Sequence, residues 1–170
     1  MNLNKNIVLV GMMGSGKSTI GYILSKSTNL NFVDVDKVIE KKTGLKIVDI
    51  FEKKGEVYFR NLEEKITLNL LKEEKKILSL GGGAFLNNNI RKEISENNLS
   101  FWLSWKSSTL IKRIYKNRKR PLAFDLSKND LRKLITKRSK IYSEANYRIN
   151  CESLSKSMIV KKIINLYGKN

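Results

Sequence analysis

The feature that most constrains this chain is a glycine-rich segment near its start, where residues 11–18 fit the pattern G-x-x-x-x-G-K-S. The apolar run at residues 7–10 predicts a buried parallel strand, and the apolar spacing that follows the segment predicts a helix. A strand, a glycine-rich turn and a helix in this order form a P-loop, whose backbone N–H groups cradle phosphates. The chain is therefore predicted to bind a nucleotide; the alternative is a glycine-rich turn without a ligand.

Each fixed position of this motif has a physical role. Glycines at positions 11, 14 and 16 allow positive φ, so that successive N–H groups point inward, and the helix adds the positive end of its dipole. Lys17 is expected to reach the β- and γ-phosphates, and the Ser18 hydroxyl to reach Mg²⁺. The nucleotide-binding residues expected here are Gly14, Ser15, Gly16, Lys17, Ser18 and Thr19.

The composition excludes several kinds of chemistry. The chain has no histidine and one cysteine, Cys151, so Cys/His zinc sites, a histidine base and an internal disulfide are excluded. A single thiol fits a reducing cytoplasm, which is the expected location. No apolar run is long enough to span a bilayer, and no signal-peptide core is present. With 170 residues, the chain is expected to form a single domain, residues 1–170.

The net charge of +18, from 34 Lys and Arg against 16 Asp and Glu, has two interpretations. It could mark a nucleic-acid binder, but the lysines are scattered rather than massed, and a basic chain also suits small anionic substrates. We therefore expect a small-molecule substrate, no nucleic-acid partner, no membrane partner and a monomer.

A second acidic segment follows the first helix. Residues 32–36 read as a short strand that contains Asp34 and Asp36, whose side chains would then point to the same side. At the carboxyl end of a parallel strand, where ligands of such folds bind, one carboxylate could hold Mg²⁺ or its waters and the other could accept a proton from a hydroxyl. The alternative is that Asp36 only caps the next helix.

The rest of the chain alternates between helical and strand patterns. The expected helices are residues 37–42 and 47–54, ended by Gly44 and Gly55, then 56–73, 87–96, 109–117 with a cap at Ser107 or Ser108, Asn129 or Asp130 to 144, and 155–167; the expected strands are 77–80, 99–105 and 147–149. This order predicts an α/β protein with three α/β/α layers around a five-stranded parallel sheet.

Three glycines follow the third strand, at residues 81–83, where they allow close approach to the backbone. Residues 36–62 would form a small substrate-binding subregion, and the basic segment at residues 117–128 a lid.

Taken together, these segments resemble the shikimate kinase family, within the nucleoside-monophosphate-kinase-like group of P-loop proteins. The matching residues, in family order, are Met12-Met13 before the P-loop core, Asp34-Val35-Asp36, the run from Gly44 to Glu63-Glu64, residues 80–84, Arg120-Pro121-Leu122, and Lys137-Arg138 with Tyr142. Two places depart from the family: Ala123 stands where a second leucine is common, and the segment after Ile149 has no confident match on the adenine side.

The resemblance implies a P-loop kinase fold and transfer of the γ-phosphoryl group of ATP to the 3-hydroxyl of shikimate, with Mg²⁺. It implies catalytic roles for Lys17, Asp36 and Arg120, with Asp36 on the hydroxyls. Arg60 and Arg138 would hold the substrate carboxylate, and Gly82 and Gly83 would contribute backbone contacts to the substrate. Arg113 would lie beside adenine, and Arg120 would also contact the nucleotide. Ser18 with Asp34 would position the metal. Without the resemblance, Arg60 reads as a solvated surface residue. A related kinase for gluconate or a nucleotide is the alternative.

Overall fold

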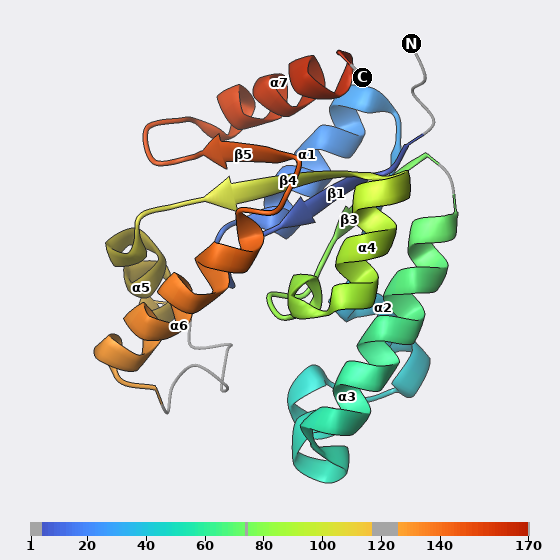
Figure 1. Ribbon diagram of the computed structural model, residues 1–170, viewed down its shortest axis with the longest axis vertical. Coiled ribbons are helices and arrows are strands. Elements are labelled where there is room, and N and C mark those ends of the chain that lie inside the picture. Colours follow the sequence, from blue (N-terminus) through green and yellow to red (C-terminus); the bar gives the residue numbers. More distant parts are fainter. Residues whose placement is uncertain (1–4, 74, 117–125, 170) are drawn as a thin grey trace.

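The five strands of this protein form one parallel sheet in a computed structural model that describes residues 5–73, 75–116 and 126–169 (Figure 1). The strand order is β2-β3-β1-β4-β5, and each neighbouring pair is parallel; on β1, Val8 pairs with Leu78 on one side and with Ser100 on the other. The strands are β1 (Ile7–Val10), β2 (Asn31–Asp34), β3 (Lys76–Ser79), β4 (Leu99–Ser104) and β5 (Tyr147–Asn150).

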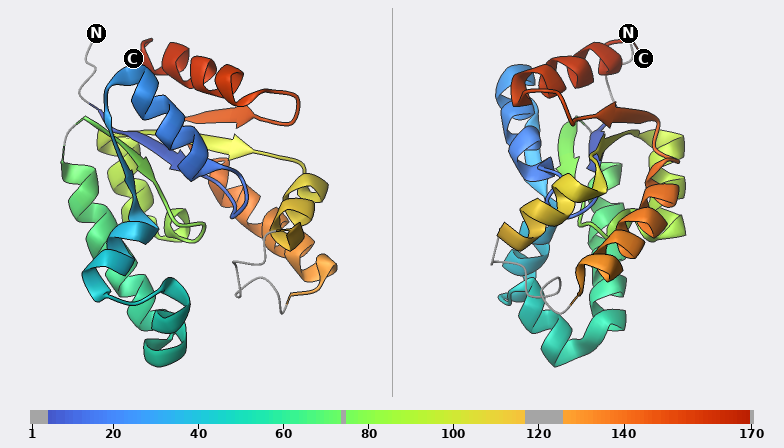
Figure 2. Two further views of the ribbon diagram at one scale, coloured as in Figure 1. Left: turned by 180° about the vertical axis from the view of Figure 1, so that it is seen from behind. Right: turned by 90° about the vertical axis from the view of Figure 1, so that its left-hand side faces the viewer.

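Helices cover both faces of the sheet (Figure 2). On β1, Ile7 and Leu9 pack with α1 and α7, whereas Val8 and Val10 pack with α3, α4 and α6. This alternation explains why the central strand is apolar at every position: both of its faces are buried. The helices are α1 (Lys17–Thr28), α2 (Val35–Thr43), α3 (Ile47–Lys72), α4 (Asn88–Asn97), α5 (Ser107–Lys116), α6 (Lys128–Tyr142) and α7 (Lys156–Tyr167), with a short 3₁₀ turn η1 (Ala84–Leu86). The predicted three-layer α/β/α fold is confirmed.

The prediction that residues 32–36 form one strand is wrong. Strand β2 ends at Asp34, which takes an extended φ of −96° and ψ of 114° as the residue before α2, and Asp36 lies in the first turn of that helix. Val35 and Ile39 are both fully buried, and they lie on the same face of α2, which packs them into the core. An acidic side chain also suits the positive end of a helix. The two carboxylates therefore project from different elements.

Two helix starts also differ from the prediction. Ser107 and Ser108 lie inside the first turn of α5 and do not precede it. Helix α6 begins at Lys128, because Ser127 is its cap: the Ser127 hydroxyl accepts a hydrogen bond from the backbone N–H of Asp130 at 3.1 Å. The cap thus lies two or three residues earlier than predicted, and α6 ends at Tyr142.

Two glycines shape the inserted segment as the sequence predicted. Gly44 has a φ of 67° after α2, and its N–H donates to the carbonyl of Glu40 at 2.9 Å, which ends the helix. Gly55, with a φ of 81° and a ψ of 168°, breaks α3 into two helical parts. Both angles lie in regions that glycine reaches at little cost. The α2–α3 segment therefore bends back on itself at the end of the sheet (Figure 1).

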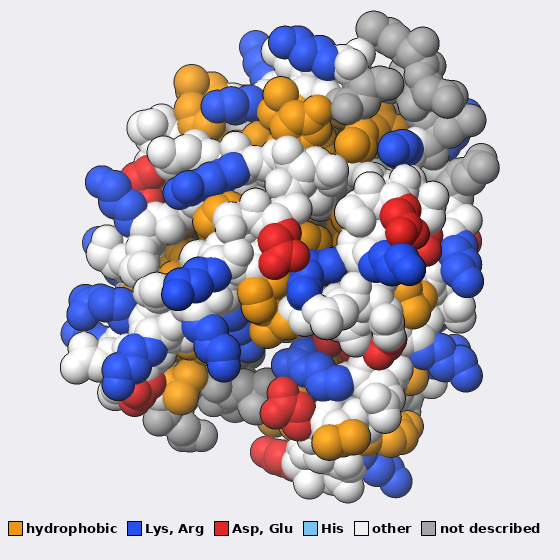
Figure 3. Space-filling view, in the orientation of Figure 1, with side chains coloured by type: hydrophobic (Ala, Val, Ile, Leu, Met, Phe, Trp, Pro, Cys, Tyr) orange, Lys and Arg blue, Asp and Glu red, His pale blue; other side chains and the backbone are white. Residues whose placement is uncertain are grey.

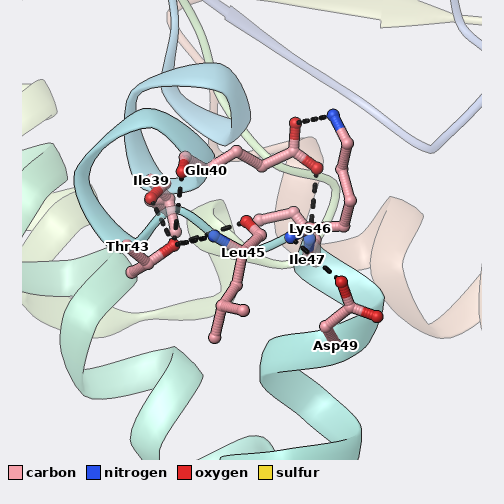
Figure 4. A network of polar contacts seen from close by, with 7 residues as sticks. All are labelled: Ile39, Glu40, Thr43, Leu45, Lys46, Ile47 and Asp49. Carbon is pink, nitrogen blue, oxygen red and sulfur yellow. Dashed lines mark hydrogen bonds and ion pairs between the residues drawn. The ribbon is translucent and has the colours of Figure 1, made fainter.

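Polar contacts hold the corner between α2 and α3 (Figure 4). The Glu40 carboxylate accepts hydrogen bonds from the backbone N–H of Ile47 at 3.1 Å and from the Lys46 ammonium at 3.3 Å. The backbone N–H of Lys46 donates to the Asp49 carboxylate at 3.3 Å, and the Thr43 hydroxyl donates to the carbonyl of Ile39 at 2.9 Å. These contacts satisfy backbone groups that the ends of the two helices leave open, so the corner is held in one arrangement.

The charged surface is mixed on the face seen in Figure 3, where Lys and Arg side chains are spread over several elements rather than gathered in one patch. This distribution agrees with the scattered lysines of the sequence. In the part of the chain that the structure describes, no helix has both the length and the apolar content that crossing a membrane requires.

Candidate active site

The predicted site residues meet around a cavity of about 980 Å³. Its wall contains parts of the P-loop, the end of β2, the start of α2, both parts of α3, residues 79–83 and one face of α6. The cavity thus lies at the carboxyl ends of parallel strands, where open α/β sheets bind ligands. Its lining residues from the sequence prediction are Gly14, Gly16, Lys17, Ser18, Thr19, Asp34, Asp36, Arg60, Gly82, Gly83 and Arg138.

The P-loop has the backbone geometry that the sequence predicted. Gly11, Gly14 and Gly16 have φ values of 140°, 82° and 91°, and α1 begins immediately afterwards at Lys17. The Lys17 side chain is buried, and its ammonium donates to the carbonyls of Gly11 at 2.8 Å and Met12 at 3.1 Å. The positive charge therefore lies against the concave side of the loop, beside the start of a helix that itself favours anions.

Ser18 and Asp34 form the part of the site that suits a divalent cation. The Ser18 hydroxyl donates to the Asp34 carboxylate at 2.5 Å, and both side chains line the cavity. Hydroxyl and carboxylate oxygens are hard donors of the type that Mg²⁺ prefers, and this ion usually takes only one or two protein ligands beside phosphates and water. Among the described residues no group of three or more His, Cys, Asp or Glu side chains gathers. This donor set fits Mg²⁺ that is held jointly with phosphates.

The three glycines after β3 are pressed against charged side chains. A Cβ atom on Gly81 would lie 2.5 Å from a Glu63 oxygen and 2.8 Å from an Asp36 oxygen, and one on Gly83 would lie 2.7 Å from the Arg60 guanidinium carbon. None of the three has a positive φ. Space, and not backbone angle, therefore requires glycine at positions 81 and 83, where a side chain would displace charged groups of the cavity wall.

Arg60 is held on several sides. Its guanidinium pairs with Glu63 at 2.6 Å and with Glu56 at 3.2 Å, and its central carbon lies 5.1 Å and 5.7 Å from the ring centres of Phe59 and Phe51. The Glu63 side chain is 3% exposed. Burial raises the pKa of the Glu63 carboxyl and outweighs the opposing effect of Arg60, and the charge of Asp36 raises it further. Burial alone would lower the pKa of Arg60, but the attraction of Glu63 raises it.

Arg138 and Tyr142 approach the glycine loop from α6. Both donate to the carbonyl of Gly82, Arg138 at 3.2 Å and Tyr142 through its phenol. Burial raises the pKa of the Tyr142 phenol to about 12, so this group remains a donor. The Arg138 Nε–H is buried and has no hydrogen-bond partner within residues 5–73, 75–116 and 126–169. A buried donor of this kind is costly unless a ligand satisfies it, which indicates an anion beside Arg138.

Two of the predicted residues, Arg113 and Ser15, do not line this cavity, and a third lies outside the described residues. Arg113 is exposed on α5, where its guanidinium stacks on the ring of Trp105 and contacts the P-loop from outside the cavity. Arg120 belongs to the predicted lid, and residues 117–125 lie outside the described residues. Ser15 is buried beneath the loop and does not line the cavity. Arg113 and Ser15 thus differ from the other predicted residues that the structure describes, which share one wall.

Sequence reasoning missed the role of Glu63 and Tyr142 in this arrangement. In the sequence, both belong to the family match and carry no role of their own. A signal for Glu63 was present, since it follows Arg60 by three residues on a predicted helix, the spacing at which opposite charges meet. For Tyr142 there was no local signal, because its partner Gly82 is distant in the sequence.

A P-loop, two neighbouring carboxylates and two arginines around one cavity, on a parallel sheet ordered 2-3-1-4-5, define a P-loop kinase of small molecules. The family model described as shikimate kinase matches residues 13–167. A shikimate kinase of Sulfurihydrogenibium sp. is 42% identical over 160 residues, which cover 94% of this chain and 96% of that protein. The chain belongs to the shikimate kinase family, a family of ATP-dependent phosphotransferases.

Solved structures agree with this assignment. The shikimate kinase from Acinetobacter baumannii in complex with shikimate superposes with a TM-score of 0.90 at 33% identity, over 98% of this chain and 94% of that one. A gluconokinase from Sinorhizobium meliloti reaches a TM-score of 0.56 at 14% identity, over 97% of this chain and 92% of that one, which is a likeness of fold alone. The family predicted from the sequence is therefore confirmed, and the gluconate alternative is not favoured.

Proposed function

We propose that this protein transfers the γ-phosphoryl group of ATP to the 3-hydroxyl of shikimate and releases shikimate 3-phosphate and ADP. The observation that carries the proposal is the shared cavity, in which Arg60, Arg138 and Asp36 all lie against the glycine loop, beside the P-loop. Shikimate is a small carboxylate with three hydroxyls. Two arginines suit its charged end, because the planar guanidinium grips a carboxylate bidentately.

On the nucleotide side, residues 14–19 bind the phosphates. The Lys17 ammonium, which donates to loop carbonyls in the structure, exchanges them for the more strongly charged β- and γ-phosphate oxygens. Arg113 lies beside the adenine, and Ser18 holds Mg²⁺ with Asp34 acting through water. When bound, Mg²⁺ supplies charge neutralisation on the phosphates.

On the acceptor side, Arg138 satisfies its buried Nε–H by binding the shikimate carboxylate, and Arg60, held by Glu63, binds the same carboxylate. Backbone groups of Gly82 and Gly83 contact the ring substituents. Asp36 accepts a hydrogen bond from the attacking hydroxyl, which it either orients or deprotonates. Phosphoryl transfer needs positioning and charge stabilisation more than covalent chemistry, so a site without histidine can perform it.

Several predictions on the wider molecule stay proposals. They are a single domain over residues 1–170, a substrate-binding subregion at about residues 36–62, a lid at about residues 117–128 that brings Arg120 to the transferring phosphoryl, a monomer, a cytoplasmic location, and no nucleic-acid or membrane partner. Closure of the lid and the subregion would exclude water from the reacting groups and limit idle ATP hydrolysis.

Acceptor-dependent ADP production tests the proposed function. The protein with MgATP is assayed against shikimate, gluconate, a nucleoside monophosphate and no acceptor. Turnover with shikimate alone is the expected result. Turnover with another acceptor and not with shikimate would overturn the substrate assignment, and turnover with none, while ATP still binds, would overturn the activity itself.

A further inference from the structure

Trp105 connects the P-loop to Arg113, and neither the motifs nor the proposed chemistry uses it. It follows the last residue of β4, and its indole N–H donates to the carbonyl of Ser15 at 2.9 Å. The Arg113 guanidinium carbon lies 3.6 Å from the centre of the Trp105 ring, which is stacking distance. Arg113 also donates to the carbonyl of Gly14 at 3.4 Å. One indole thus contacts the loop through its edge and the arginine through its face.

This arrangement leaves Arg113 with one covered side and one open side. The indole covers one face of the guanidinium, and Arg113 is exposed to solvent as a residue. A long side chain on a surface helix normally samples many rotamers, so that ordering it costs conformational entropy when a ligand binds. A ring stacked on the guanidinium and a carbonyl at its edge restrict those rotamers before any ligand arrives. The open face is then a preformed flat platform.

The platform is also placed relative to the phosphates. Helix α5 packs directly against the loop, since a Cβ atom on Gly14 would lie 3.5 Å from Ile114 and 3.7 Å from the Cβ of Arg113. The indole of Trp105 and the guanidinium of Arg113 also donate to the carbonyls of Ser15 and Gly14, which belong to the loop that cradles phosphates. The distance between platform and phosphate site is therefore set by contacts within the protein.

We propose that Trp105 is a positioning residue for the nucleotide base: it holds Arg113 flat, so that a purine stacks on the open face of the guanidinium while the phosphates occupy the P-loop. The inference rests on the proposed nucleotide site and assigns it a residue that contacts no reacting atom. The ligand chemistry that it recognises is a planar aromatic base joined to a phosphate chain. Inorganic tripolyphosphate, which has the phosphates without the base, gains nothing from the platform.

The test compares Trp105→Leu and Trp105→Phe with the unaltered chain. We expect Trp105→Leu to raise the KM for ATP about 3- to 30-fold, the range of a stacked cation, with kcat, the KM for shikimate and inhibition by tripolyphosphate unchanged. Trp105→Phe keeps an aromatic face and should recover most of the affinity for ATP. ADP should quench a tryptophan fluorescence signal that tripolyphosphate does not, and Trp105→Phe should lose that signal.

Two results would overturn this proposal. The first is an unchanged KM for ATP in Trp105→Leu, with the melting temperature of the chain retained. The second is that the binding of ATP, tripolyphosphate and shikimate weakens by the same factor, which is what a merely structural role of Trp105 would produce. The fluorescence and inhibition measurements do not require turnover, so a failure of the shikimate assignment would leave them readable and would be distinguishable from a failure of the base platform.

Discussion

The phosphate loop and a cluster of charged side chains face the same cavity but are built differently. The charged cluster consists of Asp36, Arg60, Glu63 and Arg138, which surround the glycines at residues 81–83. The loop is made by consecutive residues, and its glycines are required by positive φ values, such as 91° at Gly16. The cluster is made by side chains from α2, α3 and α6 that converge on residues 81–83. These glycines have ordinary φ, and Gly81 and Gly83 are required by space. The first region is thus determined by local backbone geometry and the second by the tertiary fold.

This difference predicts that the two regions fail in different ways. A change in the loop should reduce turnover and nucleotide binding whatever the acceptor is. A change in the cluster should reduce affinity for the acceptor and leave the nucleotide untouched. The predictions that follow test this division, beginning with the largest expected effect.

Lys17→Met should nearly abolish the transfer of phosphoryl groups. The substitution keeps an apolar stem in the buried position but removes the ammonium that donates to the loop carbonyls and is expected to stabilise the transferring charge. Loss of one such donor lowers kcat about 10²- to 10³-fold. The measurement is ADP production at saturating shikimate, and a matched control is Lys137→Met on the exposed face of α6. Normal kcat in the Lys17 variant would contradict the role assigned to the loop.

Arg60→Lys and Arg138→Lys should each raise the KM for shikimate about 10- to 100-fold, because lysine cannot grip a carboxylate bidentately. The KM for ATP should stay unchanged in both. Arg132→Lys is the control, since Arg132 lies exposed on the same helix as Arg138. Initial rates with one substrate varied at a time separate the two constants. An equal rise in both constants would mean that the arginines serve the nucleotide or the fold.

Gly83→Ala and Gly16→Ala should separate space from backbone angle. At Gly83 the new methyl group meets the flexible end of Arg60, so the protein should keep its melting temperature while the KM for shikimate rises about 10-fold. At Gly16 nothing lies within 4 Å, but the φ of 91° strains alanine, so stability should fall by about 1 kcal/mol. Thermal melting and KM measurements on both variants check this. A loss of stability in Gly83→Ala, together with an unchanged stability in Gly16→Ala, would refute the distinction between space and backbone angle.

Glu63→Gln should change how stability depends on pH. The folded pKa of Glu63 is raised by burial, so the folded state holds this proton more tightly than the unfolded state does. The free energy of unfolding of the unaltered protein, compared with that of Glu63→Gln, should therefore fall as pH rises. The fall should begin near pH 4, about the pKa of Glu in the unfolded chain, and end once the pH exceeds the raised folded pKa, above which the difference stays level. Denaturant unfolding across pH measures the difference. The exposed Glu96→Gln should show no such trend, and an opposite slope for Glu63→Gln would contradict the shift.

Much of the fold was predictable because its signals are local. The P-loop is one contiguous motif, and the buried strands are continuous apolar runs. Gly44 and Gly55 directly mark the end of α2 and the break in α3. The error at residues 32–36 arose because two acids spaced by two fit a strand, whereas in the fold α2 begins at Val35 and packs Val35 and Ile39 into the core. Burial of this kind is a property of the tertiary fold and is not visible in five residues.

The candidate site was predictable only in part from the residues themselves. Family resemblance, and not spacing, brought Arg60, Arg138 and the glycine loop together, because their partners are far apart in the sequence. Tyr142 and Trp105 were missed for the same reason, since each contacts a group on a different element. Glu63 was missed although its partner Arg60 lies three residues away on the same helix. The roles of Arg120 and the lid at about residues 117–128 remain predictions, since residues 117–125 lie outside the described residues.

The most direct test of the central claim is the transfer of phosphoryl groups to shikimate and to its carboxamide, which keeps all three hydroxyls but loses the negative charge. If Arg60 and Arg138 hold the carboxylate beside the P-loop, kcat/KM should fall about 30-fold or more for the amide, and Arg138→Lys should discriminate much less between the two acceptors. Equal kcat/KM for both acceptors in the unaltered protein would contradict the claim that this charged cluster binds the acid.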